Sequence, residues 1–322
     1  MGAWAELHVH LEGTFEPELI FAIAERNGIS LPYGDVDELK GLYEFGDLQE
    51  FLDLYYANMS VLRHGQDFTD LTDAYLARAA VAGVRRAEVF FDLQAHTSRG
   101  IPAGEALEGV HVALARSSER HGVSSGLIVT LLRHLSAESA MEAYEQARAS
   151  RVPILGIGLC STEVGNPASR FAEVFARAQA DGLYTVAHAG EEGDASYVRD
   201  VLDVLHVDRV DHGVRAAEDP ALVARLAAEQ TPLTTCPLSN VVLKGVPNLE
   251  AHPLATLLRQ GVRVTVNSDD PAYFGGYLDD NVKAVRAALG LTDAEVRTLA
   301  LNSISSSFAT DEEKERLAAT WA

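Results

Sequence analysis

The sequence predicts an α/β fold, and within that class a (β/α)8 TIM barrel with a helical insertion after the first strand. Three observations lead to this prediction. Short apolar stretches alternate with longer amphipathic segments, the alternation gives eight strand-then-helix units, and neither a repeat nor a Ser/Pro-rich linker interrupts the 322 residues. A six-stranded doubly wound sheet is the alternative architecture. We expect a single domain over residues 1–322.

The predicted strands are short apolar stretches that lie between segments with helical spacing. In chain order they are Ala5–His10, Ala87–Asp92, Gly126–Leu132, Pro153–Cys160, Leu183–His188, Arg209–His212, Pro232–Cys236 and Arg263–Ser268. The predicted helices between the later strands are Glu105–His121, Ala137–Ser150, Pro167–Asp181, Ala195–His206 and Asp219–Gln230. Ser136 and Asp219-Pro220 are helix start signals for two of them.

The region of about residues 16–82 departs from this alternation, because several helices come before the second strand. Amphipathic spacing predicts helices over Phe15–Asn27, Asp47–Val61 and Asp67–Ala82. An insertion after the first strand lies at the carboxyl-terminal face of a barrel, where loops build active sites. We therefore interpret the insertion as a lid over a substrate.

The composition limits the partners and the location of the protein. The 26 basic and 47 acidic residues give a net charge of −21, which repels phosphate backbones and anionic lipid, so we expect neither nucleic acid nor membrane as a partner. Cys160 and Cys236 are too few and too far apart for a disulfide framework. Because the first predicted strand begins within a few residues of Met1 and no apolar run spans a membrane, we expect a cytoplasmic protein. The sequence leaves open whether the chain forms a homo-oligomer.

Histidines and aspartates follow several predicted strands at their carboxyl-terminal ends. His8 and His10 are one residue apart, and residues i and i+2 of a strand point to the same side. His188 ends the fifth strand, and Asp269 follows the eighth. Three imidazoles and one carboxylate suit Zn²⁺ with an open position for water, although Fe²⁺, Co²⁺ and Mn²⁺ have compatible chemistry. The sequence therefore predicts a metal site made of His8, His10, His188 and Asp269.

Three further residues have a predicted part in the chemistry. Glu191 follows His188 by three residues, so a turn can bring its carboxyl group over the metal as a proton donor. The alternative is a carboxylate at a helix N-terminus. His212 is a further ligand, a base or a packed core histidine. We prefer a role outside the ligand set, in which it acts on the metal-bound water. Asp270 points away from Asp269 unless the backbone turns at Pro271, so we assign it to substrate binding.

Four motifs along the chain resemble those of the adenosine/adenine deaminase family of the amidohydrolase superfamily. They are His8-Val9-His10-Leu11-Glu12-Gly13, His188-Ala189-Gly190-Glu191, Asp211-His212-Gly213 and Ser268-Asp269-Asp270-Pro271. The resemblance implies hydrolytic deamination at C6 of a purine, in which Glu191 protonates N1, Asp270 holds N7, and His212 and Asp269 assist the attacking water. Related barrel hydrolases bridge two metals with a lysine on the fourth strand. Here no lysine lies between Lys40 and Lys244, so we expect one zinc ion per chain.

Within the family the sequence is more similar to the microbial adenine deaminases than to the nucleoside deaminases. Glu12 stands where adenosine deaminases usually have Asp, and residues 96–102 and 158–167 also resemble that subgroup. Glu163 is the second substrate-binding candidate, because a carboxylate at the N9–H edge of a free purine would accept its hydrogen bond and exclude a sugar. The alternative for Glu163 is a solvated loop carboxylate. Cys160 and Leu93 depart from the usual Asp and Pro of relatives, and Ala3-Trp4 from the usual Pro-Lys.

The resemblance thus implies a zinc-dependent purine aminohydrolase that converts adenine to hypoxanthine and ammonia. A deaminase of N6-substituted adenines, which releases an alkylamine, uses the same residues and stays open. An adenosine deaminase, a noncatalytic zinc-binding scaffold, and a barrel hydrolase for esters or dipeptides are weaker alternatives. Glu191 beside His188 and the missing bridging lysine count against the last of these.

Overall fold

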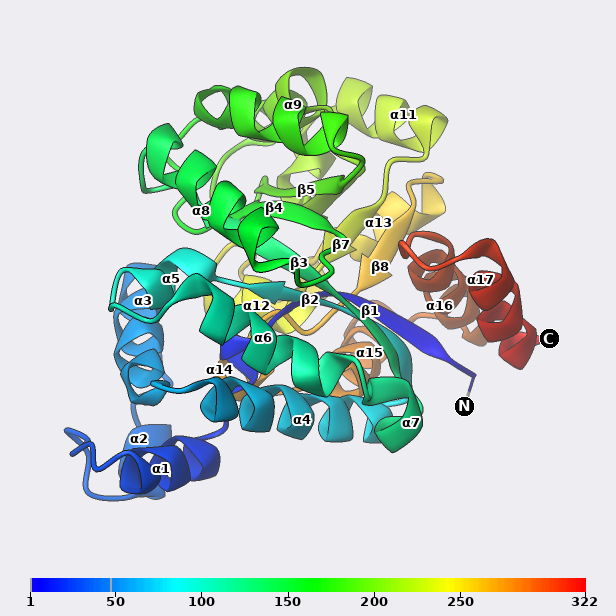
Figure 1. The fold of residues 1–322 in the computed structure, drawn as a ribbon. Coiled ribbons are helices and arrows are strands. Elements are labelled where there is room, and N and C mark those ends of the chain that lie inside the picture. Colours follow the sequence, from blue (N-terminus) through cyan, green and yellow to red (C-terminus); the bar gives the residue numbers. More distant parts are fainter. Residues whose placement is uncertain (1, 47) are drawn as a thin grey trace.

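Eight parallel strands, hydrogen-bonded in chain order, form the centre of the computed structural model, which describes residues 2–46 and 48–322 (Figure 1). They are β1 Trp4–His10, β2 Val84–Phe91, β3 Ser124–Leu132, β4 Gly156–Cys160, β5 Tyr184–Ala189, β6 Arg209–His212, β7 Leu233–Thr235 and β8 Val264–Val266. Each predicted strand overlaps one of them. The largest differences are at the starts of two strands: β2 begins three residues earlier than predicted, and β4 begins three residues later.

Backbone hydrogen bonds join β1 to the segment that follows β8 and close the sheet into a barrel. The N–H of His10 donates to the carbonyl of Asp269 at 2.9 Å, and the N–H of Asp269 donates to the carbonyl of His8 at 3.1 Å. Further down the barrel, Oδ1 of Asn267 accepts the N–H of Leu7 at 2.9 Å. The (β/α)8 prediction is confirmed, and the doubly wound alternative is wrong.

The alternation of β1 determines which of its side chains can reach the centre of the barrel. Leu7 points outward and packs in a buried cluster with Ile304 and Leu317. His8 and His10 point to the opposite side of the strand and are 0% and 6% exposed. The strand therefore presents both imidazoles to the barrel interior.

Six helical segments of the described residues lie between β1 and β2, in the region where the sequence predicts an insertion. They are η1 Glu12–Thr14, α1 Pro17–Arg26, α2 Val36–Lys40, α3 Leu48–Asn58, η2 Met59–Val61 and α4 Gly65–Val81. Two of the predicted helices overlap α1 and α4. The helix predicted over Asp47–Val61 corresponds to α3 and η2, with Asp47 outside the described residues. The short α2 has no counterpart among the predictions.

The remaining helices follow the later strands. They are α5 Leu93–Thr97, α6 Ala103–Leu114, α7 Ser117–His121, α8 Ala137–Ser150, η3 Ala168–Phe171, α9 Ala172–Ala180, α10 Ala195–Asp200, η4 Val201–Leu205, η5 Val214–Glu218, α11 Pro220–Glu229, α12 Pro237–Val242, η6 Leu249–Ala251, α13 Leu254–Arg259, α14 Pro271–Phe274, α15 Leu278–Leu289, α16 Asp293–Ser305, α17 Asp311–Ala318 and η7 Ala319–Trp321. Both start signals act as expected, because Ser136 and Asp219 accept backbone N–H groups of α8 and α11. The helix predicted over Glu105–His121 is instead divided into α6 and α7.

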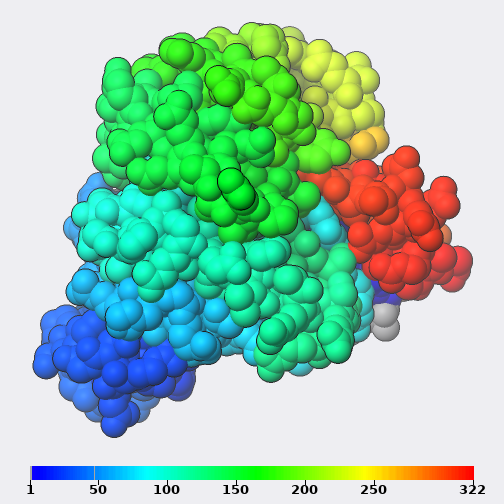
Figure 2. Space-filling model, viewed as in Figure 1, coloured from blue at the N-terminus to red at the C-terminus, as the bar shows by residue number. Residues whose placement is uncertain are grey.

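The two ends of the described chain lie side by side at the right of Figure 1. The rings of Trp4 and Trp321 meet edge to face at 5.7 Å, and Nε1 of Trp321 donates to the carbonyl of Ala3 at 2.6 Å. Figure 2 shows that the segment of α1 and α2 projects at the lower left. None of the described helices is both long enough and apolar enough to cross a membrane.

A second apolar cluster, separate from the main core, covers the carboxyl-terminal ends of the strands. We call it the mouth cluster, and it contains Phe45, Phe51, Leu52, Tyr55, Met59, Ala95, Leu132, Cys160, Tyr273 and Phe274. The helix α3 supplies three of these side chains. The cluster brings the inserted helix against the loop that follows β8, above the strand ends.

Buried charges also occupy the opposite, amino-terminal end of the barrel interior. Glu88 and Arg209 are both 0% exposed and form an ion pair. Glu88 also accepts hydrogen bonds from the Arg86 guanidinium at 3.1 Å and from the Phe308 N–H at 2.6 Å. Arg209 donates to the carbonyl of Leu7 and lies over the Phe308 ring. We call Arg86, Glu88, Arg209 and Phe308 the basal network.

Candidate active site

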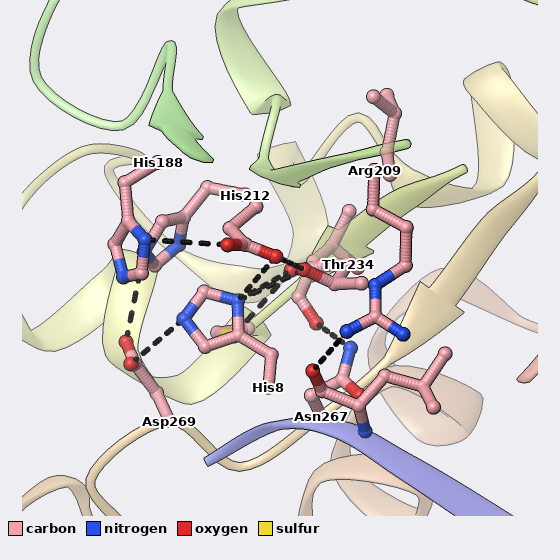
Figure 3. A network of polar contacts seen from close by, with 12 residues as sticks. His8, His188, Arg209, His212, Thr234, Asn267 and Asp269 are labelled. Atoms are coloured by element: carbon pink, nitrogen blue, oxygen red, sulfur yellow. Dashed lines mark hydrogen bonds and ion pairs between the residues drawn. The ribbon is translucent and has the colours of Figure 1, made fainter. Parts of the chain in front are cut away.

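His8, His10, His188 and Asp269 lie together in the barrel interior, and we call them the ligand cluster. One ligand atom from each lies within 4.8 Å of those of the other three. Nε2 of His10 is 3.1 Å from Nε2 of His188, and Nε2 of His8 is 3.2 Å from Oδ1 of Asp269. Figure 3 shows His8, His188 and Asp269 converging from three different strand ends. The structure thus brings together all four residues that the sequence assigns to a metal.

The donor atoms of the ligand cluster fit a zinc ion. Three imidazole nitrogens and one carboxylate oxygen are a donor set that zinc prefers. Nε2 of His8 is buried, and apart from its 3.2 Å contact with Oδ1 of Asp269 it has no hydrogen-bond partner among the described residues. A buried polar atom without a partner is costly, and a metal ion would remove that cost.

The second ring nitrogen of each histidine faces an oxygen that orients the ring. Nδ1 of His8 is 2.9 Å from Oγ1 of Thr234, which in turn donates to Asp211 at 2.8 Å. The other carboxylate oxygen of Asp211 is 3.5 Å from Nδ1 of His188. Such outer partners fix the tautomer and direct Nε2 toward a metal.

Asp92 is the corresponding outer partner of His10. Its Oδ1 is 3.7 Å from Nδ1 of His10, while Thr130 and Tyr55 donate to its carboxylate at 2.5 and 3.2 Å. His10, Asp92 and Cys160 could also group around an ion. Because Asp92 already accepts two hydroxyl hydrogen bonds, we assign it to orienting His10.

A left-handed backbone after β8 lets two adjacent aspartates serve one site. Asp269 has a φ of 65°, which is uncommon for a residue with a side chain and is typical of functional sites. The turn therefore occurs at Asp269 itself, two residues earlier than a turn at Pro271 would. Gly13 makes room for the second aspartate, because a Cβ on Gly13 would lie 2.0 Å from Oδ1 of Asp270.

Glu191 and His212 lie against the ligand cluster. Nε2 of His212 is 3.5 Å from Oε2 of Glu191 and 3.9 Å from Oδ2 of Asp269. Burial raises the pKa of Glu191 well above its usual range, and the charge of Asp269 adds to this effect. Burial lowers the pKa of His212 well below its ordinary value. At neutral pH these directions favour a protonated Glu191 and a neutral His212.

The alternative for Glu191, a carboxylate at a helix N-terminus, does not describe its position. The helix α10 begins at Ala195, and its N-cap is Asp194, whose side chain accepts the N–H of Ser196. Glu191 precedes this cap and points its carboxyl group toward His212 instead.

Asp270 is 5% exposed and lines a cavity together with Glu191, His212 and Asp269. Burial raises the pKa of its carboxyl group well above the usual range, and the adjacent charge of Asp269 acts in the same direction. Its Oδ1 has no hydrogen-bond partner among the described residues. A protonated Asp270 can donate a hydrogen bond to a ring nitrogen of a ligand.

The cavity has a polar floor and a largely apolar wall. The floor consists of members of the ligand cluster with Glu191, His212, Asp270 and Asp92. The helix α3 supplies much of the wall through Leu48, Phe51, Leu52, Tyr55 and Tyr56. Cys160 also lines the cavity, whereas Leu93 is buried in the main core.

Glu12 and Glu163 are each 1% exposed, and neither is among the described residues that line the cavity. Glu12 accepts hydrogen bonds from the Asp92 N–H at 3.0 Å and from His96 at 2.7 Å. Glu163 accepts four backbone N–H groups from the segment Gly190–Gly193. The alternative of a solvated loop carboxylate is therefore wrong for Glu163. Direct contact of either residue with a substrate stays a prediction.

The sequence interpretation missed two carboxylates, Asp92 and Asp211. Both follow the rule that located the others, because Asp92 ends a predicted strand and Asp211 precedes His212 near the end of another. Their partners, such as Thr234 for Asp211, come from other strands. Position alone could have marked them as candidates, but not as partners of particular histidines.

Comparisons with known proteins agree with this geometry. A sequence profile described as adenosine deaminase matches residues 4–321. The chain is 58% identical to an adenine deaminase of Streptomyces coelicolor over 312 residues, which cover 97% of this chain and 92% of that protein. It is 55% identical to an adenine deaminase of Stutzerimonas stutzeri over 305 residues, which cover 95% and 96%.

Solved structures of an adenine deaminase and of an amidohydrolase are also similar to this chain. The crystal structure of an adenine deaminase from Arthrobacter aurescens has a TM-score of 0.98 and 57% identity, covering 100% of this chain and 98% of that one. An amidohydrolase from Burkholderia ambifaria with bound Zn has a TM-score of 0.91 and 28% identity, covering 99% and 89%. The chain belongs to the adenosine deaminase family and is a purine aminohydrolase.

Proposed function

We propose that this enzyme hydrolyses adenine to hypoxanthine and ammonia at one zinc ion held by the ligand cluster. The observation that carries the proposal is the meeting of Glu191, His212 and Asp270 with the ligand cluster in one buried cavity. The choice of adenine is supported by the relatives at 55–58% identity, which are named adenine deaminases.

Zinc is supported by the donor set and by the bound Zn of the Burkholderia amidohydrolase. Zinc supplies Lewis acidity, which lowers the pKa of a coordinated water toward neutrality. The count of one rests on the absence of lysine between Lys40 and Lys244, which leaves the fourth strand without a bridging ligand. Metal analysis of the purified protein tests both the identity and the stoichiometry.

The protein side chains then have separate tasks. Glu191 donates its proton to N1 of the purine, which makes C6 more electrophilic. His212, neutral because it is buried, accepts a proton from the attacking water, with Asp269 beside it. Asp270 donates a hydrogen bond to N7 and fixes the ring plane. The proton taken up by His212 then passes to the C6 amino group, which leaves as ammonia, and the proton of the C6 hydroxyl group returns to Glu191.

The apolar wall favours a second candidate reaction, the release of an alkylamine from N6-substituted adenines. An alkyl group on N6 would contact Leu48, Phe51 and Leu52. This contact would favour binding, because it removes apolar surface from water. The catalytic side chains would act in the same way on either leaving group.

One assay separates these possibilities. Release of ammonia or amine is measured from adenine, adenosine and N6-alkylated adenines with the same zinc-loaded preparation, and Glu191→Gln is the control for contaminating activity. The proposal expects adenine to have the highest kcat/KM. A higher value for an N6-alkylated adenine supports the second candidate, preference for adenosine contradicts both, and no turnover of any purine contradicts the proposed function.

A further inference from the structure

The carboxylate of Glu163 is surrounded by consecutive backbone N–H groups from another loop. Its Oε1 accepts the N–H of Gly190 at 2.7 Å. Its Oε2 accepts the N–H groups of Glu191, Glu192 and Gly193 at 3.2, 3.0 and 2.8 Å. Both carboxylate oxygens of Glu163 therefore accept hydrogen bonds from the turn that follows β5.

This arrangement is an anion held in a concave turn of backbone N–H groups. Gly190 has a φ of +68°, and alternation of left- and right-handed backbone is what directs successive N–H groups to one point. Hydrogen bonds to an ionised acceptor are about twice as strong as neutral ones. Because the carboxylate is buried, these bonds are shielded from competing water.

Two further contacts hold the same two loops together. The carboxylate of Glu192 accepts the backbone N–H of Glu163 at 2.9 Å, so the two segments bond to each other in both directions. On the other side, Arg133 is 0% exposed and donates to the carbonyls of His188 and Asn166 at 2.8 and 2.7 Å. The loops after β4 and β5 thus form one bonded unit.

The backbone that Glu163 holds is the backbone that carries Glu191. From these contacts we propose that Glu163 is a positioning residue, which fixes the turn Gly190–Gly193 so that the carboxyl group of Glu191 stays over the ligand cluster. The proposal rests on the role of Glu191 in the proposed function. It replaces contact between Glu163 and the purine with an effect transmitted through four backbone hydrogen bonds.

The two roles predict different kinetics. If Glu163 contacted the substrate, its substitution would weaken binding of the substrate in the ground state as well as in the transition state. The loss of this contact would raise KM and alter the preference between adenine and adenosine. Displacement of the general acid lowers kcat for every purine that the enzyme accepts, because a shift of about 1 Å in a catalytic group can cost roughly 100-fold. The substrate preference would then stay the same.

Glu163→Gln tests the proposal, because an amide has one acceptor oxygen and its NH2 group would face backbone donors. With zinc-loaded protein we expect kcat for adenine to fall roughly 100-fold, with KM changed less than about threefold. Zinc content should equal that of the unchanged protein. Glu173→Gln is the matched control, since Glu173 is an exposed carboxylate on α9, and its kcat should be unchanged.

Hydrogen–deuterium exchange of peptides that cover residues 189–194 gives a readout that does not depend on activity. In Glu163→Gln the four amides should exchange faster in both metal-free and zinc-loaded protein, while peptides of α11 should not change. If this variant does not fold, Glu163→Asp keeps the charge but shortens the reach, and the same two measurements apply to it.

Three results would overturn the proposal: kcat within about threefold of the unchanged protein, a changed adenine/adenosine preference with kcat retained, or unchanged exchange of the turn. A failure of the proposed function is distinguishable. In that case the unchanged protein turns over no purine, and the exchange of residues 189–194 still shows whether Glu163 holds the turn.

Discussion

The two ends of the barrel interior both contain buried charged groups, but these groups differ in how completely their polar atoms are paired. At the amino-terminal end, both oxygens of Glu88 have partners, which come from Arg86, Arg209 and Phe308, and Nε of Arg209 is the one atom of this ion pair without a partner among the described residues. At the carboxyl-terminal end, Nε2 of His8 and Oδ1 of Asp270 have none among the described residues. In Figure 3 Arg209 lies at one side and His188 at the other, with Thr234 between them.

The backbone differs in a narrower way. Asp269 and His212, both at the ligand end, have positive φ values of 65° and 62°, whereas the positive φ values of Arg151, His206 and Gln230 belong to helix C-caps. Such conformations cost free energy and persist where the surroundings enforce them. The difference teaches that burial of charge does not by itself mark a catalytic site. Several unmatched polar atoms gathered at one cavity do, because they remain unfavourable until a ligand binds.

The largest expected effect follows from Glu191→Gln. The amide keeps the shape of the side chain but has no acidic proton, so kcat for adenine should fall by about 10²–10⁴-fold. The thermal unfolding temperature and the zinc content should stay close to those of the unchanged protein, because Glu191 is not in the ligand cluster. Steady-state kinetics with metal analysis checks this. Retained turnover would place the proton donor elsewhere.

Glu88→Ala tests the other end of the comparison. It leaves the guanidinium groups of Arg86 and Arg209 without their buried carboxylate, and removal of one partner of a buried ion pair typically costs about 3–5 kcal/mol. The free energy of unfolding from urea titration should fall by this amount, while kcat of the folded fraction stays unchanged.

Glu229→Ala is the control for the basal network, because Glu229 forms an exposed ion pair with Arg225 and should change stability little. A large loss of kcat in folded Glu88→Ala would contradict the separation between a structural and a catalytic end of the barrel.

Much of this architecture could be predicted from local sequence. The strands are short and apolar, and their ends are marked by polar residues such as His188 and His212, so the ligand cluster and the barrel follow from one pattern. A local signal was also overlooked, since Thr292 and Glu295 form a capping box that starts α16. By contrast, β2 begins earlier than predicted because Arg86 is buried by pairing with Glu88, a contact that hydrophobic patterning does not show.

Other features depend on contacts between distant segments. Glu163 resembles a loop carboxylate in the sequence, and only the folded chain brings it to four N–H groups about 30 residues away. Similarly, the partnership of Asp211 with Thr234 joins two strands. Residue type and strand-end position predict which side chains reach the site, whereas the tertiary structure determines which of them contact one another.

The smallest expected effect concerns the boundary between the two ends, where Thr234 connects His8 to Asp211. Thr234→Val keeps the shape of the side chain but removes the hydroxyl that lies 2.9 Å from Nδ1 of His8. Loss of such an outer partner typically weakens metal affinity about 10–100-fold, so zinc binding in a competition titration against a chelator should weaken within this range. At saturating zinc, kcat should recover most of its value, because His8 remains a ligand. Unchanged affinity would show that the barrel packing alone orients His8. Thr234 and Asp211 would then belong with the basal network rather than with the site.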